Sequence, residues 1–193
     1  IEQQLKKIAV KIHPNAGENL LIINFNYTSL IHNYFSEIKT TNSKIIDIHG
    51  SIGNDKNPII FGYGDEMDEY YTKIERLNEN AFLKNFKSFS YFYTNNYRSI
   101  LSFISDETDY DVYILGHSCG ISDRILLNNL FDNDRCKNIN ILYHKREDGT
   151  NDFFEKTQEL SRHFSATGKK EMRNKIVPFE ESKPLAQIDT TDE

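Results

Sequence analysis

Short apolar runs alternate with longer amphipathic stretches over most of the chain. The apolar runs have strand length and are rich in β-branched residues, and they fall at 20–23, 45–48, 112–115 and 139–143. Stretches with helical spacing of apolar residues fall at 1–12, 30–35, 125–131 and 152–164. Continuous apolar runs are typical of strands that helices cover on both faces of a parallel sheet. The alternation predicts an α/β, Rossmann-like three-layer sandwich with a mainly parallel sheet.

Residues 67–105 interrupt this alternation with a long helical pattern that is rich in aromatic side chains. The aromatic positions recur at the spacing of helix faces, so we expect packed helix–helix core rather than a surface on which bases stack. Two helices that break near residues 78–80 would account for the pattern. We therefore expect a helical insertion at about 67–105.

Two shorter apolar runs complete the expected sheet and set the boundary of the domain. Residues 59–61 and 176–179 predict two more strands, the second at a sheet edge because Pro178 donates no ladder hydrogen bond. A polar, acidic run follows. We expect one folded domain over residues 1–180 and a flexible polar tail over 181–193.

The charge and the cysteine content exclude several classes of function. A net charge of -6 argues against nonspecific binding of nucleic acid, which needs a basic surface. No apolar run approaches the roughly 20 residues of a membrane span, so no membrane partner is expected. Cys119 and Cys136 are too few for a four-thiolate zinc site, and the helix expected between them holds them too far apart for a disulfide. We expect two free thiols in a reducing cytoplasm, and no bound metal.

Polar turns follow three of the predicted strands, at Asn24–Thr28, His49–Gly53 and Gly116–Gly120. In an open α/β sheet, ligands bind at the carboxyl ends of the strands, so we expect these turns to share one site. Glycines in the third turn allow a tight bend and a close approach of a ligand to the backbone. Ser122 or Asp123 can cap the helix that follows.

Taken together, these turns resemble the bacteriophage abortive-infection AbiH family. The resemblance is carried by Asn24-Phe25-Asn26-Tyr27-Thr28, Ile48-His49-Gly50-Ser51, Phe61-Gly62-Tyr63-Gly64-Asp65 and Leu115-Gly116-His117-Ser118-Cys119-Gly120 with Asp123. It covers residues 20 to about 180 and implies a phage-defence effector. The partners it implies are a nucleotide ligand and either a second copy of the chain or a phage-derived trigger.

Members of this family carry a Gly-Asn-Gly-Phe-Asp-like turn after a first strand. Nothing in this chain matches that turn, and the chain opens on Ile1 rather than Met. The resemblance therefore implies a C-terminal piece of a longer protein, from which the N-terminal strand is missing.

The same turns are similar, more distantly, to SIR2-like NAD-consuming proteins. That resemblance implies roles for six residues, with NAD as substrate or ligand: catalytic Asn26 and His49, and cofactor-binding Gly50, Gly116, Ser118 and Asp123. Asn26 would orient the nicotinamide end, His49 would act as base, and the third turn would hold the ribose. Thr28 stands where the SIR2-like pattern has Asp, and the zinc cysteines of sirtuins are absent. Their absence argues against protein deacylation more than against NAD cleavage.

The residue types at positions 26 and 49 suit cleavage of a glycosidic bond. An amide side chain can orient a water or the nicotinamide carboxamide through two-sided hydrogen bonding. A histidine that titrates near neutral pH can accept a proton from a ribose hydroxyl. Structural roles stay open for both residues: Asn26 serves equally well as a helix cap, and His49 as a turn residue bonded to the backbone.

Two other functions stay open. Gly116–Gly120 fits the G-x-S-x-G nucleophile elbow in a strand–turn–helix setting, which would make the protein a serine esterase with Ser118 as nucleophile. His144 or His163 would then be the base. Alternatively, the domain binds a nucleotide without turnover, as a sensor.

Overall fold

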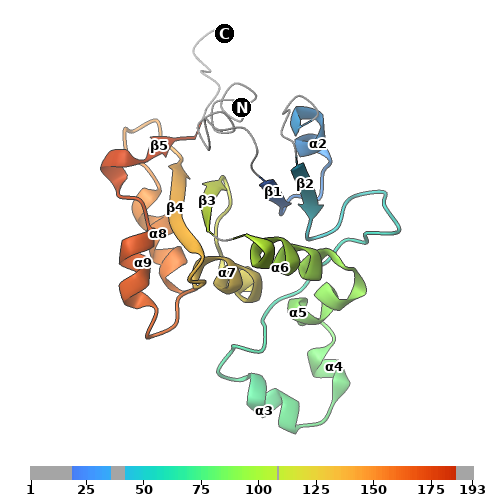
Figure 1. Ribbon diagram of the computed structural model, residues 1–193. Coiled ribbons are helices and arrows are strands. Elements are labelled where there is room, and N and C mark those ends of the chain that lie inside the picture. The colour runs from blue at the N-terminus through green and yellow to red at the C-terminus, as the bar shows by residue number, and fades with distance from the viewer. Residues whose placement is uncertain (1–18, 36–41, 108, 186–193) are drawn as a thin grey trace.

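The computed structural model describes residues 19–35, 42–107 and 109–185. It confirms the predicted α/β class, since parallel strands alternate with helices in an arrangement consistent with a Rossmann-like fold (Figure 1). The helix expected over residues 1–12 lies outside the described residues. None of the helices in the described ranges is both long enough and apolar enough to cross a membrane.

The named strands form two parallel sheets within the described ranges. The first sheet joins β1 (Asn19–Asn24) to β2 (Asn42–Asp47), and the second joins β3 (Tyr110–Leu115), β4 (Cys136–Tyr143) and β5 (Lys183–Pro184) in that order. β4 therefore has a parallel neighbour on each side. Its Ile139 and Ile141 are almost completely buried, as expected for a strand inside a parallel sheet.

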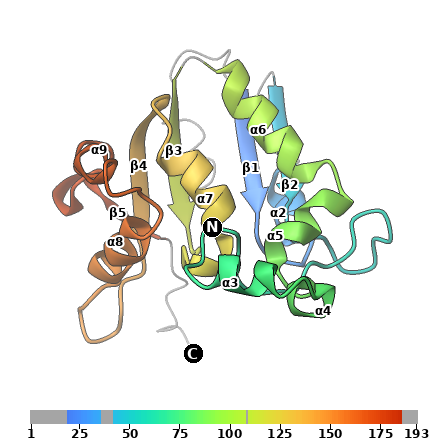
Figure 2. The same cartoon turned by 90° about the horizontal axis from the view of Figure 1, so that it is seen from below.

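β1 and β3 are the strands through which the two separate sheets of the described residues face each other (Figure 2). Near their starts, Asn19 donates a hydrogen bond to Glu107, the residue that follows helix α6 (Asn96–Asp106). Beyond their ends, the ring centroids of Phe25 and His117 lie 4.0 Å apart. The carboxyl ends of both sheets thus lie along one edge, which is where ligands bind in open α/β folds.

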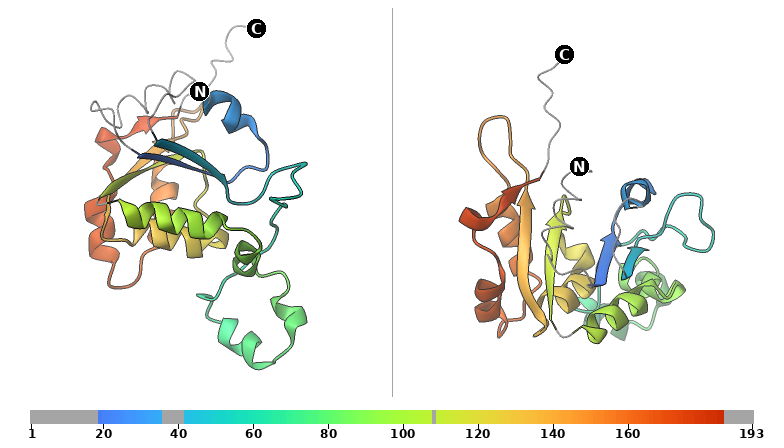
Figure 3. Two further views of the ribbon diagram at one scale, coloured as in Figure 1. Left: turned by 45° about the vertical axis from the view of Figure 1, so that its right-hand side comes forward. Right: turned by 45° about the horizontal axis from the view of Figure 1, so that its top comes forward.

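Helices cover the strands from two sides. The helices around the sheets, besides α6, are α2 (Leu30–Phe35), α7 (Arg124–Phe131), α8 (Phe153–Ser161) and α9 (Lys169–Lys175). α6 and α7 lie against one face and α2 lies beyond the other (Figure 3), while α8 and α9 pack against β4. Fully buried apolar side chains such as Ile100, Leu126 and Leu160 form the core between these layers.

The helical insertion is present but is more broken than predicted. Its elements before α6 are α3 (Tyr71–Arg76), α4 (Asn80–Leu83), α5 (Lys87–Ser90) and the 3₁₀ helix η1 (Tyr91–Tyr93). The break near residues 78–80 is confirmed, because Asn78 has a φ of 52° between α3 and α4. The prediction of two helices with one packed aromatic stripe is wrong: Phe86 is buried, but Phe82, Phe92 and Tyr93 are exposed. Helices this short cannot bury a continuous stripe.

Both of the shorter predicted strands are wrong as well. Residues 59–61 are extended but belong to no sheet, and the backbone N–H of Ile60 donates to the carbonyl of His49. Ile176 makes a single bridge to Ile139, after which Pro178 starts the 3₁₀ helix η3 (Phe179–Glu181). The chain then pairs with the end of β4 as β5. A tail that begins at residue 181 is therefore wrong for residues 181–185.

Candidate functional site

The turns that follow β1, β2 and β3 meet at the carboxyl edge of the strands. Phe25, in the first turn, lies between the other two: its ring centroid is 5.2 Å from that of His49 and 4.0 Å from that of His117. These contacts bring together the three polar turns that the sequence pattern placed at strand ends.

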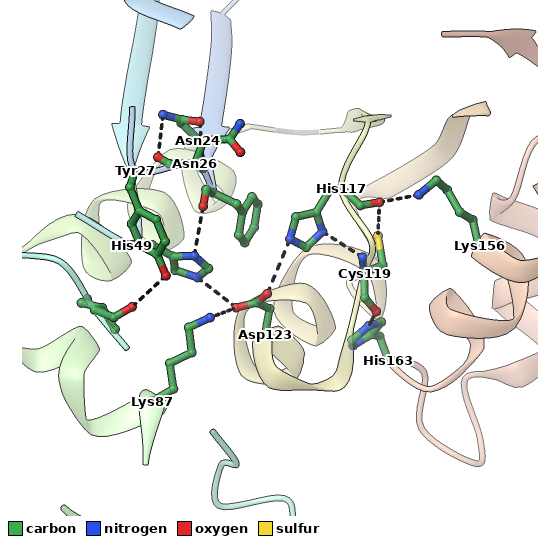
Figure 4. A network of polar contacts seen from close by, with 12 residues as sticks. Asn24, Asn26, Tyr27, His49, Lys87, His117, Cys119, Asp123, Lys156 and His163 are labelled. Carbon is green, nitrogen blue, oxygen red and sulfur yellow. Dashed lines mark hydrogen bonds and ion pairs between the residues drawn. The ribbon is translucent and has the colours of Figure 1, made fainter. Parts of the chain in front are cut away.

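Asp123 is the centre of a buried polar cluster beside these turns (Figure 4). Its Oδ1 lies 2.9 Å from His49 Nε2 and 2.7 Å from Lys87 Nζ, and its Oδ2 lies 3.5 Å from His117 Nε2. Asp123 stands at the N-cap position of α7, but its side chain caps no helical N–H. The carboxylate instead joins the second turn, the third turn and α5 of the insertion.

The cluster holds Asp123 as a carboxylate. Burial by itself would raise the pKa of Asp123, but hydrogen bonds from His117, His49 and Lys87, together with the charge of Lys87, bring this pKa well below its ordinary value. Burial, followed by the nearby charge of Asp123, raises the pKa of Tyr91. Tyr91 therefore stays a neutral phenol, whose OH lies 3.5 Å from Asp123 Oδ1.

Hydrogen bonds fix the orientation of both histidine rings. His117 Nδ1 accepts the backbone N–H of Cys119 at 3.0 Å, so the ring proton lies on Nε2, toward Asp123. His49 Nδ1 lies 3.2 Å from the carbonyl oxygen of Phe25, while its Nε2 faces Asp123. These two contacts hold the buried His49 ring between the first turn and Asp123.

Asn24 shapes the first turn, a role that the sequence pattern did not single out. Its buried side chain donates to Asp47 Oδ1 at 2.7 Å and to the backbone carbonyls of Asn26 and Thr28, and it accepts the N–H of Asn26. These bonds hold the turn so that Asn26 itself is exposed at the rim. The position of Asn24, a polar residue at the end of an apolar strand, is the sequence feature that could have indicated this role.

The three remaining predicted residues differ in their exposure. Ser118 and Gly116 are exposed at the end of β3, and Gly116 has a φ of 70°. Gly50 is buried and has a φ of 79°. A Cβ at position 50 would lie 2.1 Å from the carbonyl oxygen of Pro58, so the close approach at Gly50 is made by the chain's own backbone.

The geometry gives no support to a serine nucleophile elbow. Besides Gly116, the left-handed residue of this turn is Cys119, with a φ of 56°, rather than Ser118. His163, a candidate base, is buried and its Nε2 donates to the carbonyl of Cys119 at 2.7 Å. Burial lowers the pKa of His163, so the ring stays neutral in a structural role.

Both cysteines are free, as predicted, and both are buried. Burial raises the pKa of each thiol to about 12. Because only the thiolate reacts, iodoacetamide at about pH 8 is expected to modify neither cysteine in the folded protein and both in denaturant. Mass spectrometry of intact protein measures this, and rapid native modification of Cys119 would contradict the buried position of its turn.

A second buried ion pair connects the Gly62–Asp65 turn to α7. Arg124 Nη2 lies 2.5 Å from Asp65 Oδ1, and Arg124 Nε also donates to this carboxylate. Gly62 allows the turn to lie against the insertion, since a Cβ there would lie 2.6 Å from the carbonyl oxygen of Asn85. This turn therefore braces the segment that carries Lys87.

A hollow of about 300 Å³ opens beside the third turn. It is lined by Gly116, Leu142, His144, Arg146, Asp152, Lys156 and Leu185. Two cationic side chains and one carboxylate make it suited to a polar part of a cofactor. Among the residues that the structure describes, no three His, Cys, Asp or Glu side chains are grouped as metal ligands.

Lys87, Arg146 and Lys156 were missed by the sequence patterns. Lys87 and Lys156 lie on helices distant in sequence from the partners they contact, whereas Arg146 follows Lys145 in a hairpin and has local partners. No local spacing marks the two lysines, since their partners are set by tertiary packing.

A protein-family model described as "Bacteriophage abortive infection AbiH" matches residues 1–145. This range includes all three turns, the Gly62–Asp65 turn and the Asp123 cluster. No match was found among curated proteins or among solved structures.

Proposed function

The chain belongs to the bacteriophage abortive infection AbiH family, which gives it a role in phage defence, and from this premise we propose that it binds and hydrolyses NAD or a related nucleotide. The observation that carries the proposal is the position of Asn26, Gly116 and Ser118. All three are exposed at one edge of the strands, above a buried cluster that fixes their turns and beside a polar hollow. Carboxyl edges of parallel strands are the usual place for nucleotides.

The exposed residues supply the contacts to the ligand in this proposal. The amide of Asn26 binds the nicotinamide carboxamide, to which it can both donate and accept. The hydroxyl of Ser118 and the backbone of Gly116 hold the adjacent ribose. A second copy of the chain or a phage-derived trigger would act on this ligand-bound state, and a reducing cytoplasm is the expected location.

His49 and Asp123 act beneath these contacts. Both oxygens of Asp123 already face donors, so its task is to hold the two histidines rather than to touch the ribose. In the arrangement described, His49 is a positioning residue that links Asp123 to the Phe25 carbonyl. In this proposal His49 is also the base for a ribose hydroxyl, which it would contact through Nδ1 in place of the Phe25 carbonyl.

Nicotinamide release from NAD by the full-length protein tests the proposal. Asn26→Ala is expected to reduce release by about 100-fold, the effect of removing one well-placed polar contact, with an unchanged melting temperature because Asn26 is exposed. Asn174→Ala, an exposed asparagine on α9, is the matched control and should retain full activity.

The other outcomes separate the alternatives. Full release by Asn26→Ala would remove that residue from the mechanism. A rise in melting temperature with NAD but no release would indicate a sensor. The absence of both nicotinamide release and a thermal shift would reject the nucleotide proposal. Labelling by a fluorophosphonate probe that is lost in Ser118→Ala would indicate an esterase instead.

A further inference from the structure

The hollow beside Gly116 has the position expected of a ligand site. It lies where β3 and β4 end, because Gly116 follows β3 and Leu142 and His144 stand at the end of β4. Its 300 Å³ is the size of a small ligand or of one half of a dinucleotide. Gly116 also lies two residues before Ser118, so the hollow opens beside the turn at which the ribose is proposed to lie.

Lys156 brings a cation to this hollow from α8. Its side chain is mostly buried, and its Nζ donates to the carbonyl of His117 at 2.8 Å and lies 3.5 Å from Asp152 Oδ2. An ammonium group has three N–H donors, so these contacts leave one for a ligand. The bond to His117 also fixes the ammonium beside the third turn.

Arg146 brings a second cation from the hairpin that joins β4 to α8. The hairpin is closed by a bridge between Lys145 and Asn151 and by the bond from the N–H of Arg146 to the carbonyl of Thr150 at 2.8 Å. The guanidinium donates to the carbonyl of Asn151 at 3.0 Å and to Glu155 at 2.9 Å. These contacts orient the planar group and leave donors of the five that a guanidinium carries.

Asp152 gives the hollow its carboxylate. Its Oδ1 accepts the backbone N–H of His144 at 2.6 Å, and its Oδ2 faces Lys156. A carboxylate held in this way repels a bare anion but accepts hydrogen bonds from hydroxyl groups. Two cations with one fixed carboxylate therefore suit a ligand that carries both an anionic group and hydroxyls, as a sugar phosphate does.

Another hollow among the described residues provides a contrast. It has a volume of about 360 Å³ and is lined by Pro58, Ile59, Ile60, Phe61, Ser90 and Tyr93. None of these side chains carries a charge. Of the two hollows, the one beside Gly116 is the one equipped for a phosphate.

We propose that the hollow beside Gly116 binds the ribose-phosphate part of the nucleotide, with Arg146 and Lys156 on the phosphate oxygens and Asp152 on a ribose hydroxyl. This inference rests on the proposed function and names the part of the ligand that the hollow takes. Charge-assisted bonds from arginine to phosphate are among the stronger polar contacts in proteins.

Calorimetric titration of the full-length protein with three probes tests the proposal. NAD contains both halves of the ligand, nicotinamide riboside lacks the phosphate, and ribose 5-phosphate lacks the nicotinamide. Arg146→Ala is expected to weaken binding of NAD and of ribose 5-phosphate by about 10- to 100-fold and to leave binding of nicotinamide riboside unchanged. Arg146 is 40% exposed and not part of the core, so the variant should fold, and its melting temperature is measured alongside.

Arg162→Ala is the matched control. Arg162 is also a half-exposed arginine, with 52% of its side chain accessible, and it pairs with Glu159 at the end of α8 away from the hollow. It should change none of the three affinities. A general effect of lost positive charge would show in both variants and would overturn the assignment of Arg146.

The remaining outcomes distinguish this inference from the proposed function. Equal NAD affinity of wild type and Arg146→Ala would overturn the assignment of the hollow as the phosphate site and leave nucleotide binding intact. An Arg146→Ala variant that lost as much affinity for nicotinamide riboside as for NAD would also overturn this assignment. Binding of ribose 5-phosphate but not of NAD, lost in Arg146→Ala, would support the hollow and reject the nucleotide function. Binding of none of the three probes would reject both.

Discussion

Asp123→Asn is expected to lower the free energy of unfolding by about 3–5 kcal/mol, the usual cost of removing one partner from a buried ion pair. The carboxylate accepts from His49 and Lys87, both of which are themselves buried. An asparagine there leaves the Lys87 ammonium without a counter-ion and turns an amide NH₂ toward a group that can only donate. Urea denaturation of both proteins measures the difference.

Asp109→Asn is the matched control for this loss of charge. Asp109 pairs with Lys137 at 3.1 Å, but its side chain is 61% exposed, so the pair is screened by water. Its replacement should change the free energy of unfolding by less than about 1 kcal/mol. Equal effects of the two substitutions would show that the Asp123 cluster contributes no more than a surface pair.

A fall in pH should also destabilise the folded protein through Asp123. The pKa of Asp123 in the folded protein is lowered from its ordinary value of 3.8, so its contribution is complete above that pH and is lost as the pH falls below it. The pKa values of Asp148 and Glu155 are lowered too, but both residues are present in either protein. The wild type should therefore lose stability more steeply than Asp123→Asn below about pH 4.

Gly50→Ala is expected to lower the free energy of unfolding by about 3 kcal/mol or more. Part of the cost, about 1–2 kcal/mol, comes from the φ of 79°, which L-residues with a Cβ avoid. The larger part comes from the collision of the new methyl group with the carbonyl of Pro58, 2.1 Å away. Because Gly50 follows His49, the displacement should also weaken nucleotide binding, which the titrations above would detect.

Gly53→Ala separates the two causes. Gly53 has nearly the same φ, 77°, but a Cβ there would meet no atom within 4 Å. It should cost only about 1–2 kcal/mol and leave ligand binding unchanged. If both glycine variants lost the same stability, the contact with Pro58 would contribute nothing.

The sheet could be predicted where apolar residues ran together. The strands before His49 and Gly116, and β4, follow directly from such runs, because burial on both faces demands them. The apolar run at 59–61 was wrongly predicted to be a strand because it too contains a buried residue. Ile60 is buried because its loop packs on His49, not because it pairs with a strand. β5 escaped prediction because a two-residue strand that contains Pro184 has no apolar pattern at all.

The site was predictable only where its residues follow strands. His49 and the Gly116–Gly120 turn were found because the carboxyl ends of parallel strands converge. Asp123 was expected to cap α7 or to touch the ribose, and its actual partners could not be read locally, since Lys87 lies on a separate helix of the insertion. The ion pairs of this cluster depend on tertiary packing, which no spacing in the sequence encodes.

The two parallel sheets of the described residues form two units that share one hydrophobic core. β4 is hydrogen-bonded on both sides and flanked by α8 and α9, whereas β1 and β2 have one described strand neighbour each. Asn26 and His49 belong to the unit of β1 and β2, and Arg146 and Lys156 to the unit of β4. A nucleotide that contacts both units would therefore stabilise them relative to each other. Its binding would raise the free energy of local unfolding between β1 and β3.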